Sequence, residues 1–214
     1  MTNSLSNNST QNRYPKNITS LAKILTNKAI ILGSVIALSV CVSNAKVYKI
    51  DRARSSLEFK AVYMAINKTK GTFDTYSGNV DFDEKSRTLK VLKGEMDMNS
   101  VNTKNQQRDK HLREAEFLNV EKFPKGKFVM KSIKGNKLTA DLTLRGVTKS
   151  VVFDYELNGP EDDPMKQRSF INIELKGKIN RKDFGIGNDS TLAEASLKNE
   201  IEIYIEIGAH ETND

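Results

Sequence analysis

The sequence of 214 residues predicts an all-β protein of antiparallel strands with one short surface helix. From Lys46 onward, apolar and polar residues alternate with a period of two, as expected for sheets with one buried face and one solvated face. Turn-forming pairs such as Gly135-Asn136 and Arg145-Gly146 separate the alternating runs. Residues 103–117 are the exception, with no alternation, no glycine and no proline.

The strands are predicted run by run from this alternation. In the clearest run, residues 200–207, every second residue is isoleucine and the residues between are Glu or Tyr. Gly94 interrupts the fourth run, and the inward parity changes across it, so we predict a bulge at Gly94. Such strands could close into a barrel or pack as a sandwich. The predicted strands are 47–51, 55–62, 71–82, 87–98, 127–133, 137–145, 149–158, 168–180 and 198–208.

The helix is predicted within residues 103–117. Thr103, followed three residues later by Gln106, has the spacing of a capping box, so the helix should begin there. Its apolar stripe is thin, which predicts a helix on the surface. Lys110 and Glu114, four residues apart, are expected to form an ordinary surface pair.

The N-terminal segment predicts export. An apolar run of 14 residues, 29–42, follows Lys28 and precedes small residues ending at Ala45, which is typical of a cleaved secretory signal over residues 1–45. An uncleaved anchor is an alternative, because the uncharged stretch of 17 residues is only slightly shorter than the roughly 20 needed to span a bilayer. Lipidation of Cys41 is disfavoured because the preceding Val40 is not small. We expect a periplasmic or secreted domain over 46–208, a flexible tail over 209–214, and membrane contact only through the signal or anchor.

The charge balance argues against a nucleic-acid partner. The whole chain has 34 basic and 27 acidic residues, a net charge of +7, but four basic residues and no acidic ones lie within residues 1–45. The remaining body has a net charge of only +3, with both signs mixed. It also has no cysteine, so the core alone must hold the exported fold.

Catalytic and metal-binding residues are scarce. The body contains His111 and His210 as its imidazoles, no thiol and no Gly-x-Ser-x-Gly motif, so we predict no catalytic residue, no metal site and no cofactor. Asp109 and His111 are two apart and should point to different sides of the helix. A carboxylate enzyme using Asp162-Asp163 is the least favoured hypothesis, because adjacent acids before a proline are more simply a turn.

Several motifs resemble the YceI-like family of exported, lipocalin-like polyisoprenoid-binding proteins. The most specific segment runs from Asn99 to Pro124 and contains Arg108-Asp109-x-His111-Leu112. Other motifs agree in order and spacing and cover nearly all of residues 46–208: Tyr48-Lys-Ile-Asp51, Phe82-Asp-Glu-Lys85, Asp141 to Lys149, Glu161-Asp-Asp-Pro164 and Gly177 to Ile186. The residues at 63–70 and at Met165-Lys166 depart from the family pattern, which leaves the ligand open.

The resemblance implies an antiparallel eight-stranded lipocalin-like barrel that binds an amphiphile, such as an isoprenoid quinone or a fatty-acid-like molecule, without catalysis. It gives the helix residues Arg108, Asp109, His111 and Leu112 either a structural or a ligand-facing role. A packed barrel that acts through its outer surface is the alternative, and a homodimer is left open. From the alternation, the expected ligand-binding residues are Phe59, Phe73, Val80, Phe82, Phe128, Met130, Leu142, Leu144, Phe153, Tyr155, Ile173, Ile203 and Ile205.

Overall fold

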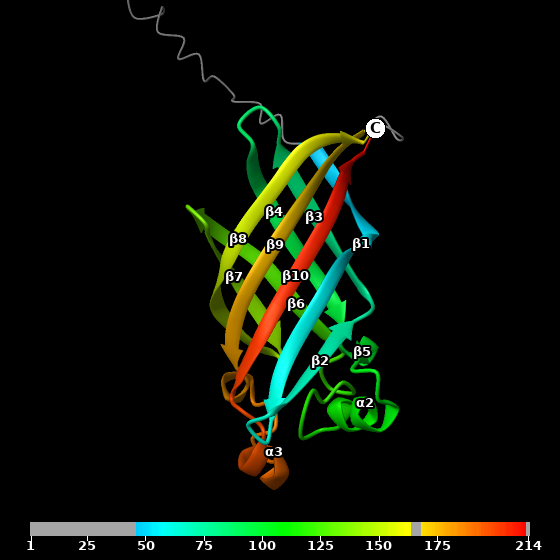
Figure 1. Cartoon of the computed structure of the whole chain (residues 1–214), viewed down its shortest axis with the longest axis vertical. Coiled ribbons are helices and arrows are strands. Elements are labelled where there is room, and N and C mark those ends of the chain that lie inside the picture. Colours follow the sequence, from blue (N-terminus) through cyan, green and yellow to red (C-terminus); the bar gives the residue numbers. More distant parts are fainter. Residues whose placement is uncertain (1–45, 164–167, 213–214) are drawn as a thin grey trace, which may run out of the picture. The chain divides into compact units, whose positions relative to one another are not determined.

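The computed structural model describes residues 46–163 and 168–212, and these form a closed antiparallel β-barrel (Figure 1). Eight strands make the ring, and pairing of its first strand with its last closes it, which confirms the predicted fold class. They are β1 (Lys46–Tyr63), β3 (Tyr76–Asp83), β4 (Thr88–Asp97), β6 (Lys125–Lys134), β7 (Lys137–Leu144), β8 (Val147–Asp163), β9 (Arg168–Asn180) and β10 (Glu200–Glu211). Two further strands, β2 (Asn67–Phe73) and β5 (Val101–Asn102), extend the sheet beside β1.

The N-terminal segment and its predicted features fall outside this description. The predicted signal over residues 1–45, including Cys41, is not among the described residues. Within the described ranges, no helix combines the length and apolar character that crossing a membrane requires.

β1 is one long strand where two short ones, 47–51 and 55–62, were predicted. Its register with β10 shifts between Ile50 and Ser55, so the residues between them form a bulge. A Cβ on Gly208, opposite the bulge, would lie 2.7 Å from the Arg54 carbonyl oxygen, so only glycine fits there. The bulge lets β1 change neighbours, from β3 at its start to β2 at its end.

The predicted single strand 71–82 is instead two strands, β2 and β3. Both strands run antiparallel to β1 in the same direction, so they lie end to end along one edge of β1 and are interrupted only at Asp74 and Thr75. Ser100 holds this interruption from the neighbouring segment, because the Asp74 amide donates to the Ser100 carbonyl at 3.2 Å and the Thr75 amide donates to Ser100 Oγ at 3.0 Å. A contact this distant in sequence leaves no local signal.

The bulge predicted at Gly94 lies elsewhere in β4. The register of β3 and β4 shifts around Lys90, between the pairs Asp81–Val91 and Phe82–Leu89. Gly94 itself is paired in regular register, and a Cβ there would lie 2.8 Å from the Ser77 carbonyl oxygen. This glycine therefore permits close approach of the two strands rather than a bulge.

The helix predicted within 103–117 is shorter and begins later. It is α2 (Gln106–Arg113), and its N-cap is Asn105, whose side-chain oxygen accepts from the Arg108 amide at 3.0 Å. The predicted capping box of Thr103 and Gln106 is wrong. Thr103 is instead buried, and both its amide and its hydroxyl donate to Asp109 Oδ1, at 2.8 and 2.5 Å.

The C-terminal strand is longer than predicted, and its connection from β9 contains short helices. β10 continues to Glu211, with Ala209 fully buried and His210 paired in register with Phe170, so residues 209–211 are not the flexible tail expected. Between β9 and β10 lie the 3-10 helix η2 (Arg181–Phe184) and the helix α3 (Thr191–Ser196), neither of which was predicted. A further 3-10 helix, η1 (Met98–Ser100), follows β4.

The barrel is tightly packed at the end where β1 begins and β10 ends, which we call the closed end. The Tyr48 and Phe82 rings meet edge to face with centroids 5.8 Å apart, and both side chains are almost fully buried. The Tyr48 hydroxyl donates to Glu84 Oε1 at 2.7 Å, and burial raises the pKa of Tyr48 to about 12. Lys46 pairs with Glu84 and Glu211 across the same end, at 2.9 and 2.6 Å.

Candidate functional site

The other half of the barrel holds a cavity of about 1030 Å³, at the upper end of the sizes typical of ligand-binding pockets. Residues of α2 (Gln106–Arg113) and α3 (Thr191–Ser196) line it, and both helices lie at one end of the barrel, which we call the mouth end (Figure 1). Polar side chains from α2 and β2 form part of the rim, among them Gln107, Lys110 and Lys68. The wall is largely apolar and comes from β1, β4, β7, β9 and β10 together with the loops after α2 and η2.

Six of the thirteen predicted ligand-binding residues line this cavity. Their side chains come from four strands of the ring or its extension, so distant runs of the sequence meet around one space. They are Phe59, Phe73, Leu142, Leu144, Ile203 and Ile205. That these residues bind a ligand stays a prediction.

The other seven predicted residues do not line the cavity. Alternation correctly places most of them inside the barrel, but it cannot distinguish the packed end from the hollow end. Val80, Phe82, Phe153 and Ile173 are fully buried core residues. Phe128 lines a separate void of about 50 Å³, and Met130 and Tyr155 are partly buried side chains packed against the core.

Several residues that line the cavity were not predicted, although the period-two alternation includes them. Leu57, Ala61 and Ile201 line the cavity and stand at period two from Phe59 or Ile203. The alternation that selected their neighbours could therefore have found them. In contrast, Ile186, Leu192 and Leu197 come from the loop and helix between β9 and β10, where no period marks the inward side.

Asp109 and Arg108, from the family motif, fasten α2 to the rim. Asp109 is only 7% exposed and accepts both polar hydrogens of Thr103, as described above. Arg108 Nε donates to Thr103 Oγ1 at 2.7 Å and Nη2 donates to the Thr103 carbonyl at 2.9 Å. Thr103 thereby joins the two motif residues. Asp109 has a structural role, whereas Arg108, which also lines the cavity, is in position to meet a ligand.

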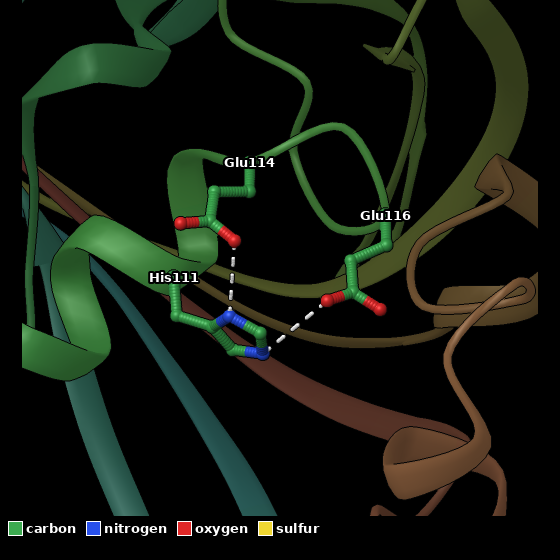
Figure 2. Close-up of side chains that lie close together, drawn as sticks. All are labelled: His111, Glu114 and Glu116. Atoms are coloured by element: carbon green, nitrogen blue, oxygen red, sulfur yellow. Dashed lines mark hydrogen bonds and ion pairs between the residues drawn. The ribbon is translucent and has the colours of Figure 1, made fainter.

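His111 lies between two carboxylates at the mouth (Figure 2). Its Nδ1 is 3.3 Å from Glu114 Oε2 and its Nε2 is 3.6 Å from Glu116 Oε1. The predicted pair of Lys110 and Glu114 is wrong, because Glu114 turns to His111 instead. The imidazole also packs against the Phe117 ring, with centroids 4.8 Å apart.

These three residues are close enough together to suggest a metal site, which the sequence did not predict. His111, Glu114 and Glu116 each offer a ligand atom, and these atoms lie within 4.8 Å of one another. However, the two ring nitrogens face different carboxylates, so one ion could not use both contacts seen in the structure. We interpret the group as a polar link between α2 and the following loop. Leu112, the remaining motif residue, packs against the core and lines the cavity.

Arg145 holds the loop after α2 against the loop after η2. It lies in the turn between β7 and β8, and its Nη1 donates to the carbonyls of Phe117 and Gly185, both at 2.6 Å. The same nitrogen lies 3.2 Å from the Glu116 carbonyl. One guanidinium therefore positions two segments that carry cavity-lining side chains.

Arg181 is a buried cation beside the cavity. Its side chain is 1% exposed, and its Nη atoms donate to the carbonyls of Ile186 at 2.8 Å, Ala193 at 3.1 Å and Leu197 at 3.4 Å. Its Nε has no hydrogen-bond partner among the described residues. Arg181 thus ties α3 and the preceding loop to the end of β9. It lies within the motif Gly177 to Ile186, but no role was predicted for it from the sequence.

Comparison with protein families identifies the chain. Residues 48–209 match the family model described as YceI-like domain. The chain belongs to the YceI-like family. Protein YceI of Salmonella newport is 40% identical over 165 residues, covering 74% of this chain and 85% of that protein. A UPF0312 protein of Staphylococcus aureus is 34% identical over 145 residues, covering 68% of this chain and 85% of its own length.

Solved structures show the same barrel. The YceI protein of Campylobacter jejuni is 35% identical with a TM-score of 0.62, covering 69% of this YceI-like chain and 88% of its own. A polyisoprenoid binding domain from Saccharophagus degradans has a TM-score of 0.61 at 14% identity, covering 78% of this chain and 99% of its own. At that identity, the second likeness shows the fold alone.

Proposed function

We propose that this YceI-like barrel binds an amphiphilic lipid with a long apolar chain, and that it carries or sequesters this lipid without chemical change. The observation that carries the proposal is the cavity of about 1030 Å³, walled by apolar side chains and rimmed by polar ones. A cavity with this distribution suits a ligand whose apolar chain is buried and whose polar end stays at the mouth.

The energy available from such a cavity is sufficient without an ion pair. Burying one methylene contributes about 0.8 kcal/mol, so ten buried methylenes would contribute about 8 kcal/mol before the costs of association. Because association itself costs several kcal/mol, more than about ten methylenes must be buried to leave the net of about 8 kcal/mol of a roughly micromolar complex, which a long apolar chain can supply. We propose that Arg108 and Lys110, at the rim, select head groups with acceptor oxygens.

The polyisoprenoid class is favoured among such lipids. The fold is shared with the polyisoprenoid binding domain named above, and the motif Arg108-Asp109-x-His111-Leu112 forms part of the rim. A branched isoprenoid chain also suits a wall of isoleucine, leucine and phenylalanine side chains. A straight-chain fatty acid is the competing ligand.

Native mass spectrometry and a cavity-filling variant test the proposal together. Protein purified from its own host should carry an extractable lipid, and the apo protein should bind geranylgeraniol more tightly than palmitic acid. Ala61→Phe adds a ring to the half-buried cavity wall and should weaken geranylgeraniol binding at least about tenfold. Val152→Phe, on the exposed outer face of β8, is the matched control and should bind as the wild type does. A folded protein that carries no lipid and binds neither compound would refute the proposal.

A further inference from the structure

The mouth end has a group of large apolar side chains that no other described residue covers. Met64 and Ile66 lie in the turn between β1 and β2 and are 61% and 79% exposed, and Leu192, in α3, is 55% exposed. We call these three residues the apolar tip. Isolated exposed hydrophobic residues are common, whereas several at one end of a molecule can together form a contact surface.

The backbone joins the two parts of the apolar tip. The Met64 amide donates to the Ser196 carbonyl at 2.7 Å, at the end of α3. Tyr63 and Leu197 form a β-bridge beside this bond, and the Lys198 amide donates to the Val62 carbonyl at 2.9 Å. The turn and α3 are therefore held as one unit, and each of them carries exposed apolar residues.

The turn keeps methionine in a conformation that disfavours it. Met64 has φ +50° and Ala65 has φ +62°, values in the left-handed region where glycine and asparagine are the usual residues. A bulky side chain in this region costs of order 1 kcal/mol or more. Strain of this kind collects at functional sites, so the exposed methionine at this position favours a role in contact.

The apolar tip continues the lining of the cavity to the outside. Leu192 belongs both to the cavity lining and to the apolar tip, since it lines the cavity and is more than half exposed. Tyr63 and Asn67, at the two ends of the β1–β2 turn, also line the cavity. In Figure 1, this turn and α3 lie at the same end of the barrel as α2. An apolar chain leaving the mouth would thus meet the apolar tip before water.

Exposed lysines surround this end. Lys68, Lys70, Lys110 and Lys198 are exposed, and none has an ion pair with another described residue. Three acidic side chains at this end have partners of their own: Glu194 Oε2 lies 2.6 Å from Lys182 Nζ, and Glu114 and Glu116 face the two ring nitrogens of His111. Flexible cations around an apolar group complement an anionic lipid surface, where each contributes to attraction.

We infer that the mouth end docks on a bilayer containing anionic phospholipid, with the apolar tip inserted between head groups and the lysines against phosphate. This inference rests on the proposed function, because docking would let a lipid pass between bilayer and cavity without crossing water. A protein partner fits less well, since three side chains are far fewer than the 20 to 30 residues of a typical stable interface.

A single-tryptophan reporter tests insertion directly. The chain has no tryptophan, so Ile66→Trp provides the sole indole, at the most exposed position of the apolar tip. Added to vesicles of phosphatidylcholine and phosphatidylglycerol, its emission should shift to the blue and be quenched by lipids brominated on their acyl chains. Val152→Trp, on the outer barrel wall, should show neither change. An Ile66→Trp emission unaffected by these vesicles overturns the inference.

Removing the tip or its charges should release the protein from vesicles. The double variant Met64→Asn with Ile66→Ser should keep the fold, because asparagine accepts positive φ, and should lower vesicle partitioning at least about tenfold. Val129→Thr with Val152→Thr removes two exposed valines from the wall and serves as the control. Cosedimentation of the tip variant at the wild-type level overturns the inference.

Two further measurements separate the inference from the function on which it rests. Lys68→Gln with Lys70→Gln should weaken partitioning about fivefold per lysine and reduce its salt dependence, whereas unchanged partitioning would count against docking on anionic lipid. Geranylgeraniol added from dilute ethanol should bind the tip variant with wild-type affinity, while transfer from vesicles should slow. A protein that binds geranylgeraniol but no vesicles overturns only the docking inference. A protein that binds vesicles but not geranylgeraniol would refute the proposed binding of lipid in the cavity.

Discussion

Replacing Arg181 by methionine should destabilise the mouth end because it removes the charge that holds α3. The two shorter bonds of Arg181, to the carbonyls of Ile186 and Ala193, are 2.8 and 3.1 Å long. Hydrogen bonds to a charged group contribute about 1.5 to 3 kcal/mol each, or about 3 to 6 kcal/mol together. Methionine also removes the cost of desolvating a buried cation whose Nε has no partner among the described residues. This gain offsets about 1 to 3 kcal/mol of the lost stability.

The net loss from Arg181→Met is therefore up to about 5 kcal/mol, with a central value of about 2.5 kcal/mol, a large share of the 5 to 15 kcal/mol by which domains are usually stable. The urea midpoint should fall by about 1 to 2 M. Hydrogen exchange should show which part opens first, because the amides of α3 lose their attachment while the closed end keeps its packing.

Lys182→Met is the matched control for Arg181→Met. Lys182 is the next residue along the chain and also binds α3, through its 2.6 Å contact with Glu194, but its side chain is 37% exposed. Exposed ion pairs stabilise proteins little, so its urea midpoint should stay close to that of the wild type. Equal midpoints for the wild type and Arg181→Met, or equal losses in the two variants, would refute the reasoning.

Two further predictions concern acid sensitivity and strand packing. Hydrogen bonds from Lys46 and Tyr48 hold the pKa of Glu84 below its usual 4.5. The stability that these bonds give the fold is therefore complete above about pH 4.5, and it is lost as the pH falls through the pKa that Glu84 has in the folded protein. The urea midpoint should drop less steeply with acidification in Glu84→Gln, and identical slopes would contradict this. A Cβ on Gly177 would lie 2.5 Å from Cδ1 of the fully buried Phe153, so Gly177→Ala should cost about 1 to 3 kcal/mol. Adding Phe153→Leu should cost less than the sum of the two single changes, and strict additivity in this cycle would disprove the clash.

The sequence was sufficient for the fold class because alternation reports burial directly. A strand with one face in the core must repeat with period two, and β7 shows this without exception, burying Leu138, Ala140, Leu142 and Leu144. The interruption at Asp74 and Thr75, between β2 and β3, was missed because Ser100, distant in sequence, supplies its hydrogen bonds. The β4 bulge was misplaced because a glycine in a strand can signal either a bulge or close approach, and here it permits close approach.

The candidate site was only partly predictable for a related reason. Inward-facing residues are equivalent in sequence whether they fill the core, as Phe153 does, or line a cavity, as Ile203 does. The arrangement of the strands in three dimensions decides which inward-facing residues lie in the packed end of the barrel and which line the cavity. Arg181 and Leu192 had no periodic context at all, since they belong to the connection between β9 and β10, where short helices replace the strand pattern.

The direction of β1 has a consequence for how the barrel can be attached. β1 starts at Lys46 at the closed end and finishes at Tyr63 at the mouth, a path of up to about 60 Å for 18 residues. Anything joined to the chain before Lys46 therefore holds the barrel by the end opposite its opening. The N-terminal attachment and the mouth are thus separated by the length of one strand, so for a chain kept on a membrane by its N-terminus, the length of the linker would limit which lipid surface the mouth can reach.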